Sequence, residues 1–243
     1  MRIWGITDTG LVRRENQDAY ATAVAADCTV AVVCDGMGGT NGGHAASSIA
    51  VDTLLHELQA ALKPAMGWPQ INEAVLHAID QANLAIRARA QEDESLSHMG
   101  TTLVCAVCRD TEAEVFNVGD SRCYLLNETG IRQITRDHSV VENMVEKGDI
   151  TPQEARRHPS RNLITRALGP DIQAQADTVS VPWNQGDFIL LCTDGLVNTV
   201  SDQEMLFEVL HDGDIESCLD HLLQISLQRG APDNITAVLL MNA

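Results

Sequence analysis

Several features that would assign a chain to a particular class are missing from these 243 residues. No stretch reaches the roughly 18 uninterrupted apolar residues of a membrane-spanning helix. The first five residues, from Met1 to Gly5, lack the apolar core of a secretory signal. Low-complexity tracts, Pro/Ser-rich linkers and fixed-period repeats are absent too. We therefore expect one compact domain over 1–243, neither exported by that route nor inserted in a membrane.

Basic residues are scarce, with 16 Lys and Arg against 34 Asp and Glu and a formal net charge of −18. Such a surface repels phosphate backbones, which argues against a nucleic-acid or anionic-membrane partner. A cationic cofactor or a basic segment of a partner fits the charge better. The alternative is that most of the acidity only keeps the protein soluble.

The seven cysteines do not suggest a disulfide framework, because their number is odd and most of them fall in apolar, periodic stretches. Cysteine in such a stretch behaves as a small buried hydrophobe, so we expect reduced thiols and a cytoplasmic protein. Cys105 and Cys108 form a C-x-x-C inside a predicted strand, and no second pair stands at metal-ligand spacing. We expect neither a zinc site nor a redox pair there.

Hydrophobic periodicity predicts strands, two helices, more strands, a helix and a closing strand. Two long helices are predicted by apolar stripes from Ala46 to Leu62 and from Ile71 to Ile86. A third is predicted around 215–223. Strands are predicted over 19–24, 29–34, 101–107, 114–118, 121–126, 131–134, 172–181, 187–193 and from 234 onward. This order predicts an α+β fold, a four-layer α/β/β/α sandwich with two mostly antiparallel sheets flanked by helices.

The segment 137–161 interrupts the strand pattern. A short amphipathic helix is predicted to end near Gly148, and Thr151-Pro152-Gln153-Glu154 carries the capping box and first-turn proline of a second helix. We expect a small helical flap at the surface, with a role either in selecting the substrate or merely as a mobile insertion.

Four acidic signatures lie at the ends of predicted strands, centred on Asp18, Asp35, Asp194 and Asp233. Two carboxylates about 5 Å apart repel by roughly 3 kcal/mol at an effective dielectric of 20, so their convergence requires divalent cations. Oxygen ligands favour Mg²⁺ or Mn²⁺ over zinc. The glycines after Asp35 allow a sharp turn that lets the Gly36 carbonyl face a metal as well. Each aspartate alone could instead be a turn or capping residue.

Six motifs, taken together, resemble the metal-dependent serine/threonine protein phosphatases, the PPM or type 2C class, in its bacterial form. They match the family's motifs in order and spacing from about residue 5 to 240: Gly10-Leu11-Val12-Arg13-x-x-Asn16-Gln17-Asp18, Asp35-Gly36-Met37-Gly38-Gly39, Met99-Gly100-Thr101-Thr102, Val118-Gly119-Asp120-Ser121-Arg122, Thr193-Asp194-Gly195 and Asp233-Asn234-Ile235-Thr236.

The resemblance implies a role for each of these positions. Asp35 corresponds to the carboxylate that bridges two metals. Asp194 and Asp233 correspond to side-chain ligands of one metal, and Asp18 and the Gly36 carbonyl to ligands of the other. Asp120 corresponds to the ligand that shares a third, weaker site with Asp194; alternatively it is only a turn residue of a hairpin. Arg13 corresponds to the arginine that holds the substrate phosphate, with Arg14 as a rival.

The implied activity is hydrolysis of phosphoserine and phosphothreonine in proteins by direct attack of a metal-bridging water, using two or three Mn²⁺ or Mg²⁺ ions. The expected partners are phosphorylated proteins, among them a bacterial Ser/Thr kinase and its substrates, and we expect a monomer. Two alternatives stay open: a non-catalytic phosphoprotein- or metal-binding module, and a small-molecule phosphoesterase. A tyrosine-phosphatase mechanism is excluded because no cysteine is followed by arginine six residues later.

Two positions depart from the family pattern. Many eukaryotic relatives carry histidine, the usual candidate acid for the leaving group, where Met37 stands, and methionine has no proton to donate. A metal-bound water is the preferred acid, and His138 and His44 are the outside candidates. His44 itself stands where bacterial relatives commonly have glutamate.

Overall fold

The strands of the computed structural model, which describes residues 1–211 and 215–243, form two antiparallel sheets. The first has the order β1-β11-β10-β7-β8, with the bounds Arg2–Asp8, Ile235–Met241, Phe188–Cys192, Arg122–Asn127 and Gly130–Gln133. The second has the order β2-β3-β5-β6-β9, with the bounds Asp18–Ala25, Cys28–Met37, Leu103–Cys108, Glu112–Val118 and Asp177–Pro182. A short strand, β4 (Gly100–Thr101), pairs with the end of β3.

The helices fall into three groups along the chain. The long helices α1 (Gly39–Ala61) and α2 (Trp68–Glu92) follow β3, and a 3₁₀ turn, η1 (Glu94–Leu96), comes after them. The short helices α3 (Val140–Glu146) and α4 (Pro152–Ala155) lie between β8 and β9. The last group comprises α5 (Asp194–Val197), α6 (Asp202–His211) and α7 (Cys218–Gln228). No helix in the described ranges is long and apolar enough to span a membrane.

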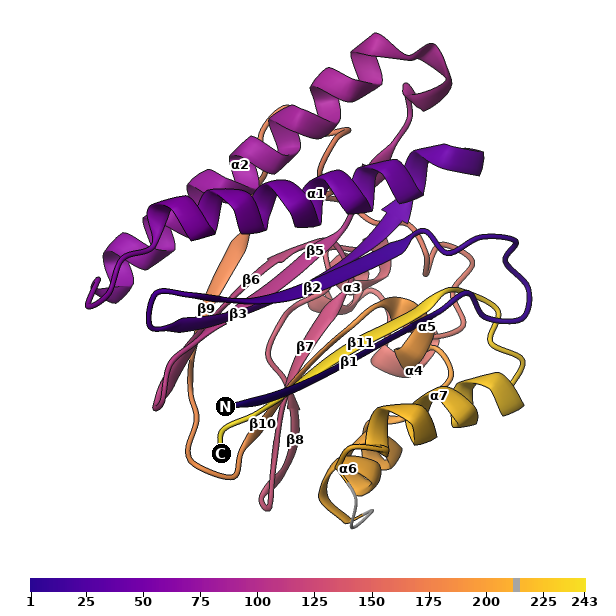
Figure 1. The fold of residues 1–243 in the computed structure, drawn as a ribbon. Helices are drawn as coiled ribbons and strands as arrows, with labels where there is room; N and C mark the ends of the chain where they lie inside the picture. Colours follow the sequence, from indigo (N-terminus) through magenta and orange to yellow (C-terminus); the bar gives the residue numbers. More distant parts are fainter. Residues whose placement is uncertain (212–214) are drawn as a thin grey trace.

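Figure 1 shows the two sheets packed on each other, with α1 and α2 over one outer face and α6 and α7 over the other. The predicted four-layer sandwich is therefore confirmed. Both faces of strand β3 are buried, which explains why its sequence is a continuous apolar run. Val32 and Cys34 pack beneath α1 and α2, whereas Ala31 and Val33 pack between the sheets.

The cysteines are buried thiols, as expected. Cys105 belongs to the core beneath α1 and α2, and Cys108 belongs to the core between the sheets. The two side chains of the C-x-x-C therefore point to opposite faces of β5, so they cannot form a chelating or redox pair.

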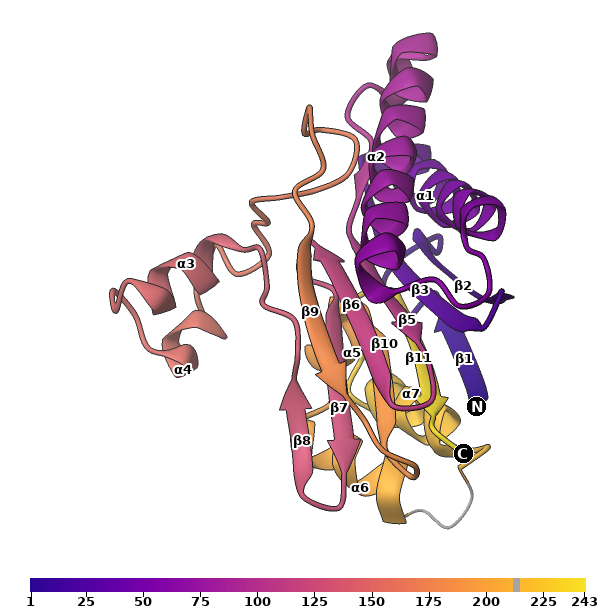
Figure 2. The ribbon, with the colours of Figure 1, turned by 90° about the vertical axis from the view of Figure 1, so that its left-hand side faces the viewer.

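The segment that contains α3 and α4 projects sideways from the sandwich (Figure 2). Its two ends are held together by main-chain hydrogen bonds, from Val140 N to the Leu163 carbonyl at 2.8 Å and from Thr165 N to the His138 carbonyl at 2.7 Å. We call residues 138–165 the flap. The predicted capping box at Thr151 and Glu154 is present.

The structure differs from the predicted elements at three points. The strand predicted over 172–181 begins only at Asp177, and the first residue of the predicted segment is hydrogen-bonded to α2 and not to a strand. Asn83 of α2 donates to the carbonyl of Ile172, the first residue of the predicted strand, and to that of Asp171 just before it. Helix α6 was not predicted, and the third long helix runs over Cys218–Gln228 where 215–223 was expected.

The hairpin alternative for Asp120 is also wrong. Strand β6 ends at Val118 and β7 begins at Arg122, but the two strands belong to different sheets. The Gly119-Asp120-Ser121 corner therefore carries the chain from one sheet to the other.

Gly36 is required where β3 meets the start of α1. A Cβ atom at Gly36 would lie 2.1 Å from the Gly43 carbonyl oxygen and 2.5 Å from that of Gln17, and both oxygens belong to backbone that cannot swing away. We predict that Gly36→Ala lowers the free energy of unfolding in urea by about 2–3 kcal/mol.

Gly67→Ala is the matched control, because its Cβ would meet nothing closer than 3.7 Å. We expect it to change stability by less than about 0.5 kcal/mol. Equal effects of the two substitutions would contradict the packing explanation.

Candidate active site

The sheets bring together aspartates that are far apart in the sequence. Asp18 begins β2 and lies directly opposite Asp35 of β3 in the strand register. Asp194 is the first residue of α5, just after β10, and Asp233 precedes the neighbouring strand β11. Each sheet thus contributes two carboxylates at the ends of its strands.

Hydrogen bonds next to the carboxylates join the aspartate pair of one sheet to that of the other. The Thr193 hydroxyl donates to Asp18 Oδ2 at 2.9 Å and accepts from the Thr236 amide at 3.0 Å. Thr193 precedes Asp194, and Thr236 is the second residue of β11. The relative position of the two sheets at this edge is therefore fixed by side chains next to the carboxylates.

A cavity of about 490 Å³ opens at this edge. Its lining includes most of the predicted site residues: Arg13, Asp35, Gly36, Asp120, Asp194 and Asp233. Asp18 is not among the lining residues, because it is only 6% exposed and lies behind Asp35. The structure therefore places five predicted carboxylates in one region, four of them on the cavity wall.

Burial of Asp18, Asp35, Asp120 and Asp194 raises their pKa values. Loss of solvation is the main cause, followed by repulsion from neighbouring aspartates. The pKa values of Asp18 and Asp120 rise to about 7, and that of Asp35 rises well above its usual range. The pKa of Asp194 is raised as well, chiefly by burial and then by Asp233. Positive charge in the cavity would relieve this repulsion.

The donor set fits hard divalent cations. Asp18 Oδ1 and Asp194 Oδ1 are buried carboxylate oxygens with no hydrogen-bond partner in the described structure. Such orphaned acceptors are costly unless a ligand satisfies them. No three Asp, Glu, His or Cys side chains in the described ranges are already arranged around one ion position. Carboxylate, carbonyl and water oxygens together are the ligands that Mg²⁺ and Mn²⁺ prefer.

Arg13 lies at the cavity wall and forms an ion pair with Asp233 at 2.7 Å. This hydrogen bond is the first cause that raises the arginine pKa. The side chain is still 54% exposed, so it can turn toward an incoming anion. Arg14 lines the same cavity, so the structure leaves both arginines as candidates for the phosphate.

Met37 stands where many eukaryotic relatives carry the histidine acid, and it lies at the carboxylate cavity, but the two candidate histidines do not. Met37, the last residue of β3, lines the cavity, whereas His44 is exposed on α1 outside it. His138 is 5% exposed and lines another cavity, which shares no residue with the carboxylate cavity. Neither histidine is positioned to protonate a leaving group.

Sequence reasoning missed the residues that hold the carboxylates in place. The Thr102 hydroxyl accepts the Asp35 amide at 2.9 Å, and the Thr101 hydroxyl donates to the Asp35 carbonyl at 2.9 Å. The Asn234 amide side chain binds the Thr9 and Glu15 carbonyls and accepts the Gln17 amide, which fixes the loop that carries Arg13. These polar residues stood inside the recognised motifs, and that was the only signal for them.

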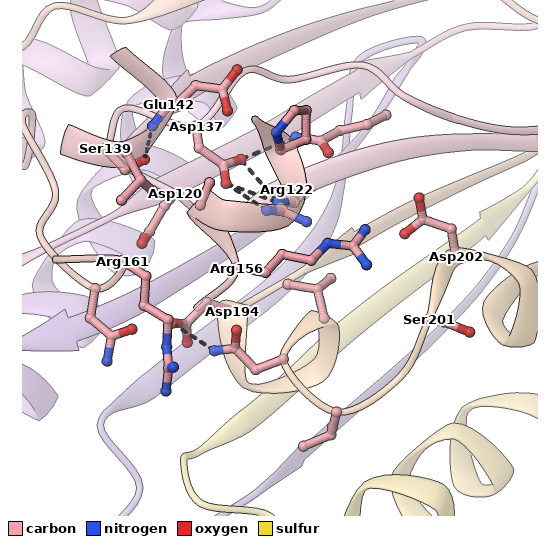
Figure 3. Close-up of a pocket in the computed structure, with 18 of the residues that line it drawn as sticks. Asp120, Arg122, Asp137, Ser139, Glu142, Arg156, Arg161, Asp194, Ser201 and Asp202 are labelled. Atoms are coloured by element: carbon pink, nitrogen blue, oxygen red, sulfur yellow. Dashed lines mark hydrogen bonds and ion pairs between the residues drawn. The ribbon is translucent and has the colours of Figure 1, made fainter. Parts of the chain in front are cut away.

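A second cavity, of about 470 Å³, lies between the flap and the sandwich and shares Asp120, Asn162 and Asp194 with the first. Figure 3 shows Arg156 and Arg161 of the flap reaching into it. Arg122 lies at the wall of this second cavity, and its Nη2 forms an ion pair with Asp137 Oδ2 at 2.7 Å. In contrast, no side-chain partner of Arg156 or Arg161 is found within 1–211 and 215–243.

Comparison with known proteins decides the family. The model for "Protein phosphatase 2C" matches residues 12–239 of this chain. The chain belongs to the protein phosphatase 2C family. As the resemblance predicted, it is thus one of the metal-dependent serine/threonine protein phosphatases.

Similar proteins come from several bacteria. The chain is 34% identical over 235 residues to the serine/threonine phosphatase stp of Listeria welshimeri, an alignment that covers 96% of this chain and 93% of that protein. It is 35% identical to PstP of Mycobacterium tuberculosis over 96% of this chain but 43% of that longer protein. The crystal structure of Stp1 from Staphylococcus aureus is 36% identical and has a TM-score of 0.92, covering 98% of this chain and 94% of Stp1.

Cation binding should stabilise this phosphatase because it neutralises the buried carboxylates. At a Mn²⁺ concentration of about 100 times Kd, mass action adds about 2.7 kcal/mol of stability. For a domain of this size that corresponds to a rise in Tm of about 5–10 °C in scanning calorimetry. Asp35→Asn should remove most of this rise, and the metal-free variant should unfold no earlier than the metal-free wild type, because one buried repulsion is gone.

Asp52→Asn on the exposed side of α1 is the control and should keep the full Mn²⁺ effect. The metal assignment would be wrong if Mn²⁺ raised the Tm of Asp35→Asn as much as that of the control.

Proposed function

We propose that this phosphatase uses Asp18, Asp35, Gly36, Asp120, Asp194 and Asp233 to hold two or three Mn²⁺ or Mg²⁺ ions, and hydrolyses phosphoserine and phosphothreonine of proteins directly. The observation that carries the proposal is the gathering of buried carboxylates from both sheets around one cavity, with two orphaned oxygens. When bound, the cations supply the charge that activates water and neutralises the phosphoryl oxygens.

The protein's own residues position the reactants. Asp35 is fixed from both sides of its peptide by Thr101 and Thr102, which makes it the rigid centre of the site. Arg13 exchanges its Asp233 contact for the substrate phosphate, to which its planar fork can donate two hydrogen bonds. No cysteine nucleophile takes part, because all seven thiols are buried.

The expected biological role is reversal of a bacterial Ser/Thr kinase in the cytoplasm, with the kinase and its targets as substrates. Relatives named serine/threonine phosphatases support this role. The chain's own charge is consistent with it, since a net charge of −18 favours basic segments in a partner. We expect the phosphatase to act as a monomer.

The decisive test is turnover of a phosphothreonine peptide. Activity should require Mn²⁺ or Mg²⁺, vanish with chelator, and fall by at least about 10³-fold in Asp35→Asn. Metal binding in calorimetry without hydrolysis of any phosphoester would support a non-catalytic module. Faster turnover of nucleotides or sugar phosphates than of phosphopeptides would support a small-molecule phosphoesterase.

The two neighbouring arginines can be separated by substitution. If Arg13 holds the phosphate, Arg13→Ala should lower kcat/KM on the peptide by about 10²-fold, the effect of losing a charge-assisted contact of about 2–3 kcal/mol. Arg14→Ala, the matched control, should change it by less than about threefold. The reverse ranking would assign the phosphate to Arg14.

The flap cavity accounts for substrate selection in this proposal. Arg156 reaches into the cavity next to the carboxylates and has no side-chain partner in the part of the chain that the structure describes, so it is available to an acidic group of the substrate. Arg156→Ala should lower kcat/KM on an acidic phosphopeptide about tenfold and leave p-nitrophenyl phosphate hydrolysis unchanged.

Arg157 is the control, because it is also exposed but does not line this cavity. Arg157→Ala should behave like the wild type on both substrates. A loss on p-nitrophenyl phosphate in Arg156→Ala would show that this arginine acts on the reacting phosphate itself.

A further inference from the structure

His138 lies where three parts of the molecule meet, and no role in the reaction described above accounts for it. It is the first residue of the flap, its side chain is 5% exposed, and both ring nitrogens have partners. It is far too buried to be explained as a surface histidine. The contacts it makes are with the Gly119-Asp120 corner, the far end of the flap and β9.

The contact with the corner is made at two points. The His138 amide donates to the Gly119 carbonyl at 2.9 Å, and the Gly119 amide donates to His138 Nδ1 at 3.1 Å. Gly119 has a φ of +105°, and a Cβ there would lie 2.6 Å from Thr102 Cγ2. The corner therefore has little freedom, and His138 holds both of its main-chain polar groups.

The contact fixes the tautomer of the ring. An amide N–H can only donate, so Nδ1 must be the unprotonated nitrogen and the ring proton of the neutral form must be on Nε2. Nε2 lies 3.1 Å from Asp177 Oδ2, which accepts this proton. Arg166 donates to the other oxygen of Asp177 at 2.7 Å and comes within 3.1 Å of Nε2. Burial, and then this arginine, lower the pKa of His138.

The same residue joins both ends of the flap. The His138 carbonyl accepts the Thr165 amide at 2.7 Å, and the neighbouring Arg166 shares Asp177 with the ring. A chain of contacts therefore runs from the flap exit, through the imidazole, to the backbone just before Asp120.

We infer that His138 is a positioning residue: as the neutral Nε2–H tautomer it fixes the Gly119-Asp120 corner against both ends of the flap, and so holds Asp120 ready for a cation. This inference rests on the proposed function in one respect, the role of Asp120 as a metal ligand. The tautomer and the corner contact depend on neither metal nor substrate.

Two substitutions separate the two sides of the ring. In His138→Asn the amide oxygen can occupy the place of Nδ1 and accept the Gly119 amide, but nothing reaches Asp177. In His138→Gln the longer side chain can reach Asp177 from the place of Nε2, and the Gly119 amide loses its acceptor. His56→Gln on the exposed side of α1 is the control for replacing a histidine by glutamine.

The first measurement uses metal-free protein. Nitrogen-15 NMR of wild-type protein should show the His138 ring protonated on Nε2 alone, and a proton on Nδ1 would overturn the inference. Hydrogen exchange at the Gly119 amide should speed up about tenfold or more in His138→Gln and stay near the wild-type rate in His138→Asn and His56→Gln. Equal exchange in all variants would also overturn it.

The second measurement concerns the cation. In calorimetric titration with Mn²⁺, the weakest binding step should weaken about tenfold in His138→Gln, with little change in His138→Asn, as is typical when the support of a metal ligand is removed. In peptide turnover, kcat should fall for His138→Gln while KM stays within about twofold.

The outcomes distinguish this inference from the proposed function. If Asp35→Asn remains active, the proposed function fails. The NMR and exchange measurements on metal-free protein still test the positioning role of His138 independently. If His138→Asn weakens Mn²⁺ binding and raises Gly119 exchange while His138→Gln does neither, with the Tm of both variants equal, the histidine acts through Asp177 and the positioning of the corner is refuted.

Discussion

Repulsion among buried carboxylates is the constraint on which the rest of this phosphatase depends. Asp35, Asp120, Asp194 and Asp233 line one cavity at the edge where the two sheets meet, with Asp18 buried next to Asp35, and burial raises the pKa of Asp18, Asp35, Asp120 and Asp194. A fold stabilised only by its own contacts would not accumulate such charges. Much of the surrounding architecture is therefore needed to hold them together until cations arrive.

The support for the carboxylates comes from neutral groups and not from counter-charges. Thr101 and Thr102 bind the backbone of Asp35, Thr193 binds Asp18, and Asn234 fixes the loop that leads to Arg13. Hydroxyl and amide groups can orient an acidic side chain without neutralising it, so the negative potential stays available for a metal. Arg13 is the exception, because its bond to Asp233 is exposed enough to be exchanged.

The sequence allowed the layers and the residues of the site to be predicted, because both leave periodic or local signals. Apolar runs beside Asp35 and Asp194 marked strands buried on both faces, and the motif spacing pointed to the family. Long-range partners left no such signal. That Asp18 lies behind Asp35, that Gly119 is held by His138, and that Asn83 binds the loop before β9 all depend on elements distant in the chain. Helix α6 has a local signal, the Ser201 and Glu204 capping box at its start.

The way the flap is attached has a consequence for how such enzymes diverge. Its entry and exit are bonded to each other at His138, Val140, Leu163 and Thr165, so the intervening stretch is a closed excursion whose length and sequence do not affect the spacing of the strands. Evolution, or a protein engineer, can thus exchange this stretch as a cassette without moving the strands that carry the carboxylates.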